Sequence, residues 1–256
     1  MKVCLDAGHY GNYNRSPAVP EYCESKQMWT LHLLLKDALT RRGVAVITTR
    51  AEQAKDMPLT DRGRAAKGCD LFLSLHSNAV GSRVDENVDY PVSYVMLDGT
   101  STEIGQRLAN CVRQVMGTRQ SGRTATRRGT NGEYYGVLRG AAAVRVPGVI
   151  LEHSFHTQTR ASRWLMSDAN LKKLAEAEAD VIVQWLMEQK GEEPVTYEQF
   201  VEYMERYEKE KAAQPATWEG AVMDQAATAG LITGGRPKSN ITRGEMAQVL
   251  KNARLM

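Results

Sequence analysis

The stretch DLFLSLH, residues 70–76, is a nearly continuous apolar run that ends in a histidine. Four other runs have similar apolar character and are rich in β-branched residues, namely residues 2–6, 44–49, 92–97 and 148–152. Strands covered on both faces show this pattern, whereas strands with one face in water alternate polar and apolar residues. The five runs therefore predict strands of a mostly parallel sheet.

Helical patterns separate these strands, at residues 24–42, 59–67, 101–116 and 168–190. Gly43 follows the first pattern, where a glycine commonly ends a helix. The alternation predicts an α/β fold, with an open, twisted, mostly parallel sheet flanked by helices. Residues 117–133 contain four arginines and four glycines without apolar periodicity, so we expect a surface loop there.

A charged Gly/Pro stretch at residues 191–194 marks the end of this domain. We therefore expect a first domain over residues 1–190 and a small all-α module over residues 191–256. A helical pattern covers residues 197–211, and Thr242 with Glu245 fits a capping box before an apolar face.

Composition narrows the class of protein. With 256 residues, 42% hydrophobic and 25% charged, the chain can bury a sizeable core. It shows no signal-peptide pattern and no apolar run of membrane-spanning length, so we expect synthesis in the cytoplasm, with release by other means before any work outside the cell. Four scattered cysteines predict reduced thiols rather than a zinc ribbon or disulfide framework.

The charge distribution leaves the partner open. The net charge of +3 conceals a front part near +5 and a tail near −2, which favours either an anionic polymer as partner or a solvated mixed surface. No glycine-rich phosphate loop follows a strand, so neither nucleotide nor nucleic-acid binding is expected.

Four side chains are expected at one edge of the sheet. His9 follows the first strand, His76 ends the third, Glu152 ends the last, and Glu24 begins the first helix. Ligands of open α/β sheets bind beyond the carboxyl ends of the strands. Two imidazoles and one carboxylate form a usual catalytic zinc site with a fourth position left for water, which predicts His9, Glu24 and His76 as Zn²⁺ ligands. Glu152 fits a general acid and base whose pKa burial would raise.

Six segments then carry a resemblance: LDAGHYG, CESKQMW, TTR with LTDRGRAA, DLFLSLHSNA, YYGVLRG and PGVILEHSFHT. Their order and spacing over residues 1–187 resemble the zinc-dependent N-acetylmuramoyl-L-alanine amidase family of the amidase-3 type. The resemblance implies that His9, Glu24 and His76 bind zinc and that Glu152 is catalytic. It also implies the reaction: zinc-activated water would cleave the amide between N-acetylmuramic acid and the L-alanine of the stem peptide in peptidoglycan.

Two positions depart from the family pattern. Tyr10 stands where a glycine is usual after the first histidine, and His153 with Ser154 stands where leucine and glycine are usual after the catalytic glutamate. The second variant resembles a branch common among phage endolysins. It therefore implies a phage or prophage endolysin that acts on the cell wall after release.

Several residues have competing interpretations. Glu21 competes with Glu24 as ligand, and the spacing to Gly43 favours Glu24. Arg139 and His153 are candidate substrate-binding residues, although Arg139 could equally form a salt bridge at the sheet edge. Structural roles beside the site are the alternative for both His153 and His156. His32, within an apolar helix, is expected to be packed or at the surface.

The tail and the reaction also leave alternatives. Residues 218–250 resemble one S-layer-homology-like repeat, which implies binding to a secondary cell-wall polymer; homo-oligomerisation through this module is the alternative. For the first domain, the alternatives are a zinc peptidase or deacetylase acting on another wall amide, and a wall-binding protein with a vestigial site.

Overall fold

A six-stranded sheet forms the centre of the chain in the computed structural model, which describes residues 1–130, 132–191, 201–207 and 209. Its order is β2-β1-β3-β8-β4-β5. Strands β2, β1, β3 and β8 are parallel, β4 runs antiparallel to β8, and β5 is parallel to β4. The prediction of a mostly parallel sheet is therefore confirmed. The bounds are β1 Lys2–Ala7, β2 Ala45–Thr48, β3 Leu71–Asn78, β4 Val92–Val95, β5 Arg123–Ala125 and β8 Gly148–Phe155.

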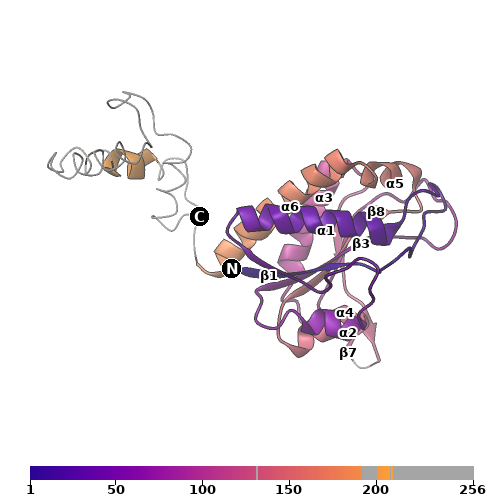
Figure 1. Cartoon of the computed structure of the whole chain (residues 1–256), viewed down its shortest axis with the longest axis horizontal. Helices are drawn as coiled ribbons and strands as arrows, with labels where there is room; N and C mark the ends of the chain where they lie inside the picture. The colour runs from indigo at the N-terminus through magenta and orange to yellow at the C-terminus, as the bar shows by residue number, and fades with distance from the viewer. Residues whose placement is uncertain (131, 192–200, 208, 210–256) are drawn as a thin grey trace, which may run out of the picture. The chain divides into compact units, whose positions relative to one another are not determined.

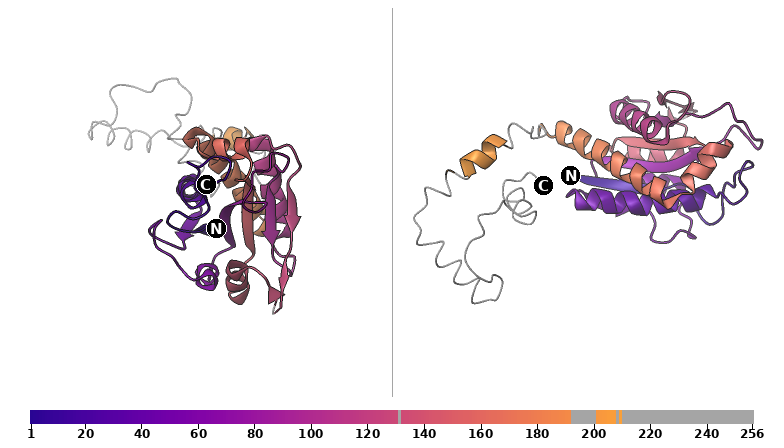
Figure 2. Two further views of the ribbon diagram at one scale, coloured as in Figure 1. Left: turned by 90° about the vertical axis from the view of Figure 1, so that its right-hand side faces the viewer. Right: turned by 90° about the horizontal axis from the view of Figure 1, so that it is seen from above.

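Helices cover both faces of this sheet, as the views in Figures 1 and 2 show. One face is covered by α1 (Glu24–Arg41), α3 (Thr102–Met116) and α6 (Asp168–Gln189), and the other by α2 (Leu59–Arg64) and α4 (Gly136–Ala143). The short helix α5 (Thr159–Leu165) follows β8, and β6 (Arg128–Gly129) pairs with β7 (Gly132–Glu133) in a separate two-stranded sheet. This three-layer arrangement confirms the predicted α/β fold class.

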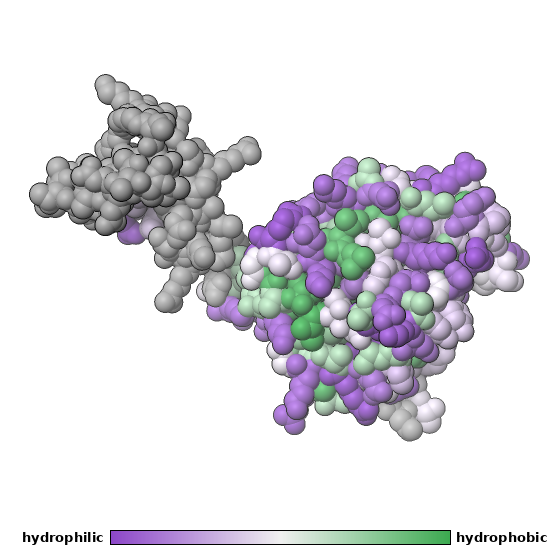
Figure 3. All heavy atoms as spheres, viewed as in Figure 1, coloured by the Kyte–Doolittle hydropathy of each residue, from purple (hydrophilic) through white to green (hydrophobic). Residues whose placement is uncertain are grey.

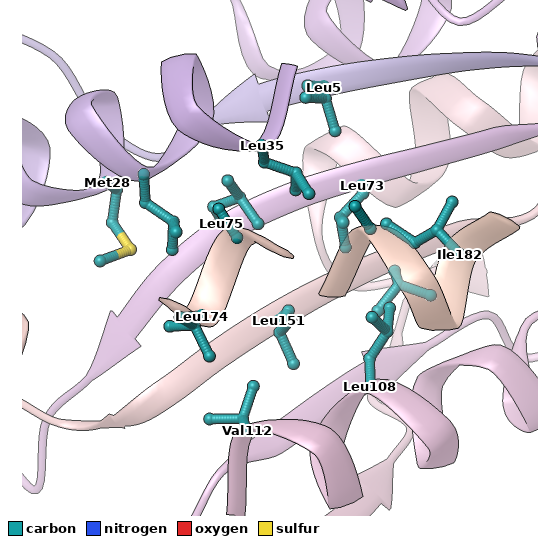
Figure 4. Packing of buried hydrophobic residues seen from close by; sticks show 14 of the residues in the cluster. Leu5, Met28, Leu35, Leu73, Leu75, Leu108, Val112, Leu151, Leu174 and Ile182 are labelled. Atoms are coloured by element: carbon teal, nitrogen blue, oxygen red, sulfur yellow. The ribbon is translucent and has the colours of Figure 1, made fainter. Parts of the chain in front are cut away.

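The larger core lies between the sheet and α1, α3 and α6. Leu73, Leu75 and Leu151 project from β3 and β8 toward Leu35 and Ile182 of the covering helices (Figure 4), and all five are fully buried. Burying one such side chain contributes about 1.5–3 kcal/mol, so this layer fixes where the strand ends lie. Figure 3 shows hydrophilic residues over much of the coloured face, with a hydrophobic area among them. No helix among the described residues is long and apolar enough to span a membrane.

The other face is closed by two helices that touch almost backbone to backbone. A Cβ added at Gly63 of α2 would lie 2.0 Å from the carbonyl oxygen of Val137, and one at Gly140 of α4 would lie 2.1 Å from that of Thr60. Glycine is therefore required at both positions because α2 and α4 pack without side chains between them.

Three parts of the first domain differ from the sequence-based expectation. The expected loop at residues 117–133 contains β5, which joins the sheet, as well as β6 and β7. Helices α4 and α5 were not expected. These elements have two to eight residues, which is too short for a periodic apolar pattern to stand out, and they owe their structure to tertiary packing.

The chain separates into two compact units, Met1–Glu192 and Glu193–Met256. Residues 201–207 of the second unit are helical. The S-layer-homology-like repeat and the capping box at Thr242 and Glu245 lie outside the described residues, so the all-α module stays a prediction.

Candidate active site

The turn after β1 directs His9 back over the end of β3. The backbone N–H of Gly8 donates to the carbonyl of Leu75 at 2.9 Å, and a Cβ at Gly8 would lie 2.5 Å from the imidazole of His76. His9 itself has a φ of +56°, in the left-handed region that side chains other than glycine rarely adopt. Such a backbone costs on the order of 1–3 kcal/mol and is found mostly at functional sites.

Two buried arginines hold this turn in place. The guanidinium groups of Arg50 and Arg62 donate to the carbonyl of Ala7 at 2.6 and 3.4 Å. Below them, the fully buried Asp6 carboxylate accepts hydrogen bonds from Thr49 and Ser74 at 2.6 and 2.7 Å. The TTR and LTDRGRAA segments thus supply the arginines that fix the end of β1, and with it the position of His9.

Glu24, at the start of α1, is almost completely buried at 1% exposure. Its Oε1 accepts from the backbone N–H of Ser77 at 3.0 Å and lies 2.9 Å from Nδ1 of His76. Its Oε2 accepts from Nδ2 of Asn14 at 2.8 Å and lies 3.5 Å from Nε2 of His9. One donor atom each from His9, Glu24 and His76 therefore lie within 4.8 Å of one another.

The electrostatics of this cluster follow from its burial. Burial alone would raise the pKa of Glu24, but the hydrogen bond from His76 and the nearby imidazoles hold that pKa well below its ordinary value. Burial would likewise lower the pKa of His76, and its hydrogen bond to the Glu24 carboxylate raises it instead. The pKa of His9 is lowered by burial and by the neighbouring His76. The site thus keeps an ionised carboxylate between two imidazoles.

These donors fit a divalent cation. Among the described residues, Glu24 forms ion pairs only with imidazoles, of His9, His76 and, at 3.8 Å, His156, so no lysine or arginine neutralises its buried charge. Two imidazole nitrogens and one carboxylate oxygen are the ligand set of many catalytic zinc sites. Imidazole donors favour zinc over magnesium or calcium, which prefer oxygen ligands alone.

Glu152 lies beside this cluster on the neighbouring strand. It is the direct register partner of His76 where β3 and β8 pair in parallel. Its Oε2 is buried and has no hydrogen-bond partner among the described residues. Burial, together with the charge of Glu24, raises the pKa of Glu152 to about 7, and the charge of His76 opposes this rise. A carboxyl group with that pKa can both accept and release a proton near neutral pH.

A bulge follows Glu152. Between His76–Glu152 and Asn78–Phe155 the pairing shifts by one residue, and Ser154 adopts a φ of +60° within it. The Ser154 hydroxyl donates to the fully buried Asp89 carboxylate at 2.8 Å. A positive φ explains why the family pattern has glycine at this position, and here the hydrogen bond to Asp89 supports a serine instead.

Alternation along β8 places His153 on the face opposite Glu152, toward α6, together with Val149 and Leu151. Nδ1 of His153 lies 2.8 Å from the carbonyl oxygen of His76, and Nε2 lies 2.7 Å from Oε1 of Glu178 on α6. Both side chains are 0% exposed. Because both ring nitrogens are engaged and no surface is left, His153 is not placed to contact a substrate. His153 instead braces the backbone of His76 against α6, which is the structural role that the sequence analysis left open.

The remaining candidate residues of the sequence analysis lie outside the cluster of His9, Glu24 and His76. Nδ1 of His156 is buried against Ser77, 3.0 Å from its hydroxyl, and His32 is buried within α1. Glu21 is exposed and outside the cluster, in agreement with the choice of Glu24. Arg139 is exposed, and its Nη1 donates to the carbonyls of Glu133 and Tyr134 at 3.0 and 2.7 Å. It thus supports a loop, and contact with substrate stays a prediction.

Two residues of the site were missed by the sequence analysis. Asn14, which bridges Glu24 and His9, lies in a loop and carries no periodic signal. Glu178 could have been found: it falls on the apolar stripe of α6 between Leu174 and Ile182, and a carboxylate there needs a buried partner.

Fold and site together define an α/β protein with a histidine–carboxylate cluster, suited to a metal ion, at the carboxyl edge of a parallel sheet. The family model described as N-acetylmuramoyl-L-alanine amidase matches residues 3–184, and the chain belongs to this family. The family acts on peptidoglycan. A comparison with curated protein sequences gives no match.

Solved structures show the same fold. An N-acetylmuramoyl-L-alanine amidase from Clostridium difficile 630 is 19% identical with a TM-score of 0.62, over 72% of this chain and 96% of that one. The catalytic domain of CwlV from Bacillus (Paenibacillus) polymyxa var. colistinus is 18% identical with a TM-score of 0.58, over 72% and 97%. AmiC2 of Nostoc punctiforme is 21% identical with a TM-score of 0.60, over 73% and 97%.

Proposed function

We propose that this chain is a zinc-dependent amidase that hydrolyses the amide between the lactyl group of N-acetylmuramic acid and the L-alanine of the peptidoglycan stem peptide. Family membership supports the choice of substrate and bond. The observation that carries the proposal is the convergence of His9, Glu24 and His76, with Glu152 in register beside His76.

The three donors would hold Zn²⁺. This ion, when bound, would polarise the amide carbonyl and lower the pKa of water, so that water can lose a proton and attack the carbonyl carbon near neutral pH. His76 and Glu24 orient each other, and Ser77 and Asn14 fix the two carboxylate oxygens, so the donors are arranged before an ion arrives. The site therefore needs little rearrangement to bind a cation.

Glu152 handles the proton in this reaction. Its carboxylate accepts a proton as the water oxygen bonds to the carbonyl carbon, and releases it to the nitrogen as the C–N bond breaks. The proton taken from water thus leaves on the α-amino group of L-alanine. The raised pKa of Glu152 suits both halves of this exchange, because the group is neither too weak a base nor too weak an acid near pH 7.

Fragment mass spectrometry on purified peptidoglycan tests this proposal. We expect free stem peptides with an L-alanine amino terminus and intact glycan strands. Cleavage between two amino acids of the stem, or loss of acetyl groups from the sugars, would contradict it and favour a peptidase or deacetylase.

We further propose that the chain acts as a phage or prophage endolysin and that the second unit binds a secondary cell-wall polymer. The variant at His153 and Ser154 and the repeat-like tail support these two roles. Co-sedimentation of the full-length Glu152→Gln variant with walls, before and after removal of the secondary polymers, tests the second role. Equal binding to both preparations would contradict it.

A further inference from the structure

Two tyrosines stand beside His9 in the segment that joins β1 to α1. The rings of Tyr10 and Tyr13 lie 4.7 Å apart, and their hydroxyl oxygens are 3.3 Å apart. The ring of Tyr13 stacks against the imidazole of His9, with centroids 6.4 Å apart and planes inclined by 16°. Tyr13 is nevertheless 50% exposed, which makes it one of the most exposed large side chains of the described residues.

The backbone that carries these rings is fixed. The N–H of Gly11 donates to the carbonyl of Gln53 at 3.1 Å, and the carbonyl of Gly11 accepts from Gln53 and Ser25 at 2.7 and 2.8 Å. The carbonyl of Asn14 accepts from the N–H of Glu24 at 2.9 Å. The exposed ring of Tyr13 and the half-buried ring of Tyr10 thus lie on a segment that needs no further ordering, which lowers the entropic cost of binding a ligand.

From this arrangement we propose that Tyr10 and Tyr13 form a platform for a pyranose ring, namely that of the N-acetylmuramic acid whose lactyl amide is cleaved. The proposal rests on the proposed function, because the lactyl group places the sugar next to the scissile bond and hence next to His9. Exposed aromatic faces bind the C–H face of a sugar, and the paired hydroxyls can both donate to and accept from its polar groups.

The stem peptide is the other part of the substrate that could lie on this platform. Its carboxylates call for cationic partners, whereas the platform offers two neutral rings and two hydroxyls. The sugar therefore matches the chemistry of the pair better. Tyr10 stands where the family pattern has glycine, so half of the platform is a feature of this chain rather than of the general pattern.

Nuclear magnetic resonance on the full chain with isotope-labelled tyrosine rings tests the platform without any turnover. The probe is the disaccharide of N-acetylglucosamine and N-acetylmuramic acid, which carries no peptide and no scissile amide. We expect the ring signals of Tyr10 and Tyr13 to shift on titration at millimolar concentration, and signals of the other tyrosines to shift less. Unmoved signals of both rings would overturn the proposal.

Variants then measure the contribution of the ring. Tyr13→Ala should raise the dissociation constant for the disaccharide about fivefold, a change typical of losing one aromatic contact. Tyr13→Phe keeps the ring and should raise that constant about twofold at most. Leu33→Ala removes a similarly exposed apolar side chain, at 47% exposure, from the middle of α1 and should bind as the parent does. Thermal unfolding of each variant checks that it folds.

Two results would overturn the platform: a Tyr13→Ala variant that binds the disaccharide as tightly as the parent, or ring signals that respond to free stem peptide and not to disaccharide. These outcomes are separate from those of the proposed function. Disaccharide binding with no release of stem peptides would reject the amidase and keep the platform. Release of stem peptides with no disaccharide binding would keep the amidase and reject the platform.

Discussion

Nδ1 of His76 lies 2.9 Å from Oε1 of Glu24, and the backbone N–H of the next residue, Ser77, donates to the same oxygen at 3.0 Å. The last residues of β3 thus hold the first carboxylate of α1, although 52 positions separate the two side chains in the sequence. This contact joins the sheet to the helix at the point where the strands end. Substitution can therefore test separately whether Glu24 binds the metal and whether Glu152 transfers the proton.

Glu24→Gln should abolish tight zinc binding. The amide keeps the size of the side chain but removes the charge that the cation needs. Loss of a residue that merely orients a ligand already lowers metal affinity about 10–100-fold, so we expect a decrease beyond about a hundredfold here. Zinc titration by calorimetry measures it, with Glu21→Gln as the matched control because that side chain is exposed and outside the cluster. Equal affinity in both variants would show that Glu24 is not a ligand.

Glu152→Gln should separate metal binding from turnover. We expect zinc affinity like that of the parent, with a rate of stem-peptide release reduced by a factor on the order of a hundred or more, since proton transfer by a positioned group contributes 10²–10⁴-fold. Metal analysis measures the zinc bound by each protein, and an assay of released amino groups measures the rate of stem-peptide release. A variant that retained its activity would remove Glu152 from the mechanism.

Glu178→Ala should strongly destabilise the fold. It leaves His153 buried without its partner at 2.7 Å, and breaking a buried pair costs about 3–5 kcal/mol. Glu176→Ala on the same helix removes a surface partner of Arg41 and Arg42 and should cost about 0–1 kcal/mol. Urea unfolding measures both variants.

The pair His153→Leu with Glu178→Leu provides the internal check on that result. Because it removes both polar groups, we expect it to recover much of the stability lost in Glu178→Ala. A double variant less stable than Glu178→Ala would mean that the hydrogen bond to the His76 carbonyl, and not the pair, carries the stability.

Gly140→Ala should destabilise the contact between α2 and α4. The added methyl would lie 2.1 Å from the carbonyl oxygen of Thr60, so the helices must separate, which costs about 1–3 kcal/mol. Arg64→Ala, at an exposed position of α2, is the control for a substitution outside the contact. Thermal unfolding compares the two, and a Gly140→Ala variant as stable as the control would contradict the close packing.

The long helices and strands were predictable because one face of a helix, or both faces of a strand, must be apolar where it is buried. The apolar runs of β1, β3 and β8 and the helical spacing of α1, α3 and α6 follow from burial against a neighbouring layer, and their bounds came out within three residues. Elements such as β5 and α4 depend on partners distant in sequence. The requirement for glycine at Gly63 and Gly140 exists only where the two helices meet.

In the site, too, residues at the ends of long strands and helices were predictable, whereas those that depend on loops or distant partners were not. His9, Glu24, His76 and Glu152 were predictable because strand ends and a helix start bring them to one edge. His153 kept two interpretations in the sequence, because alternation along β8 sets only its face, and its partner Glu178 on α6 is 25 positions away. Asn14 was missed because its role depends on a loop conformation.

We propose above all that two imidazoles and one carboxylate hold a single catalytic zinc ion. Anomalous diffraction from a crystal of the full chain grown with zinc, recorded on both sides of the zinc absorption edge, tests it most directly. We expect one strong anomalous peak ligated by His9, Glu24 and His76 and facing Glu152. A crystal with no peak among these three residues, or with zinc bound only elsewhere on the chain, would contradict it.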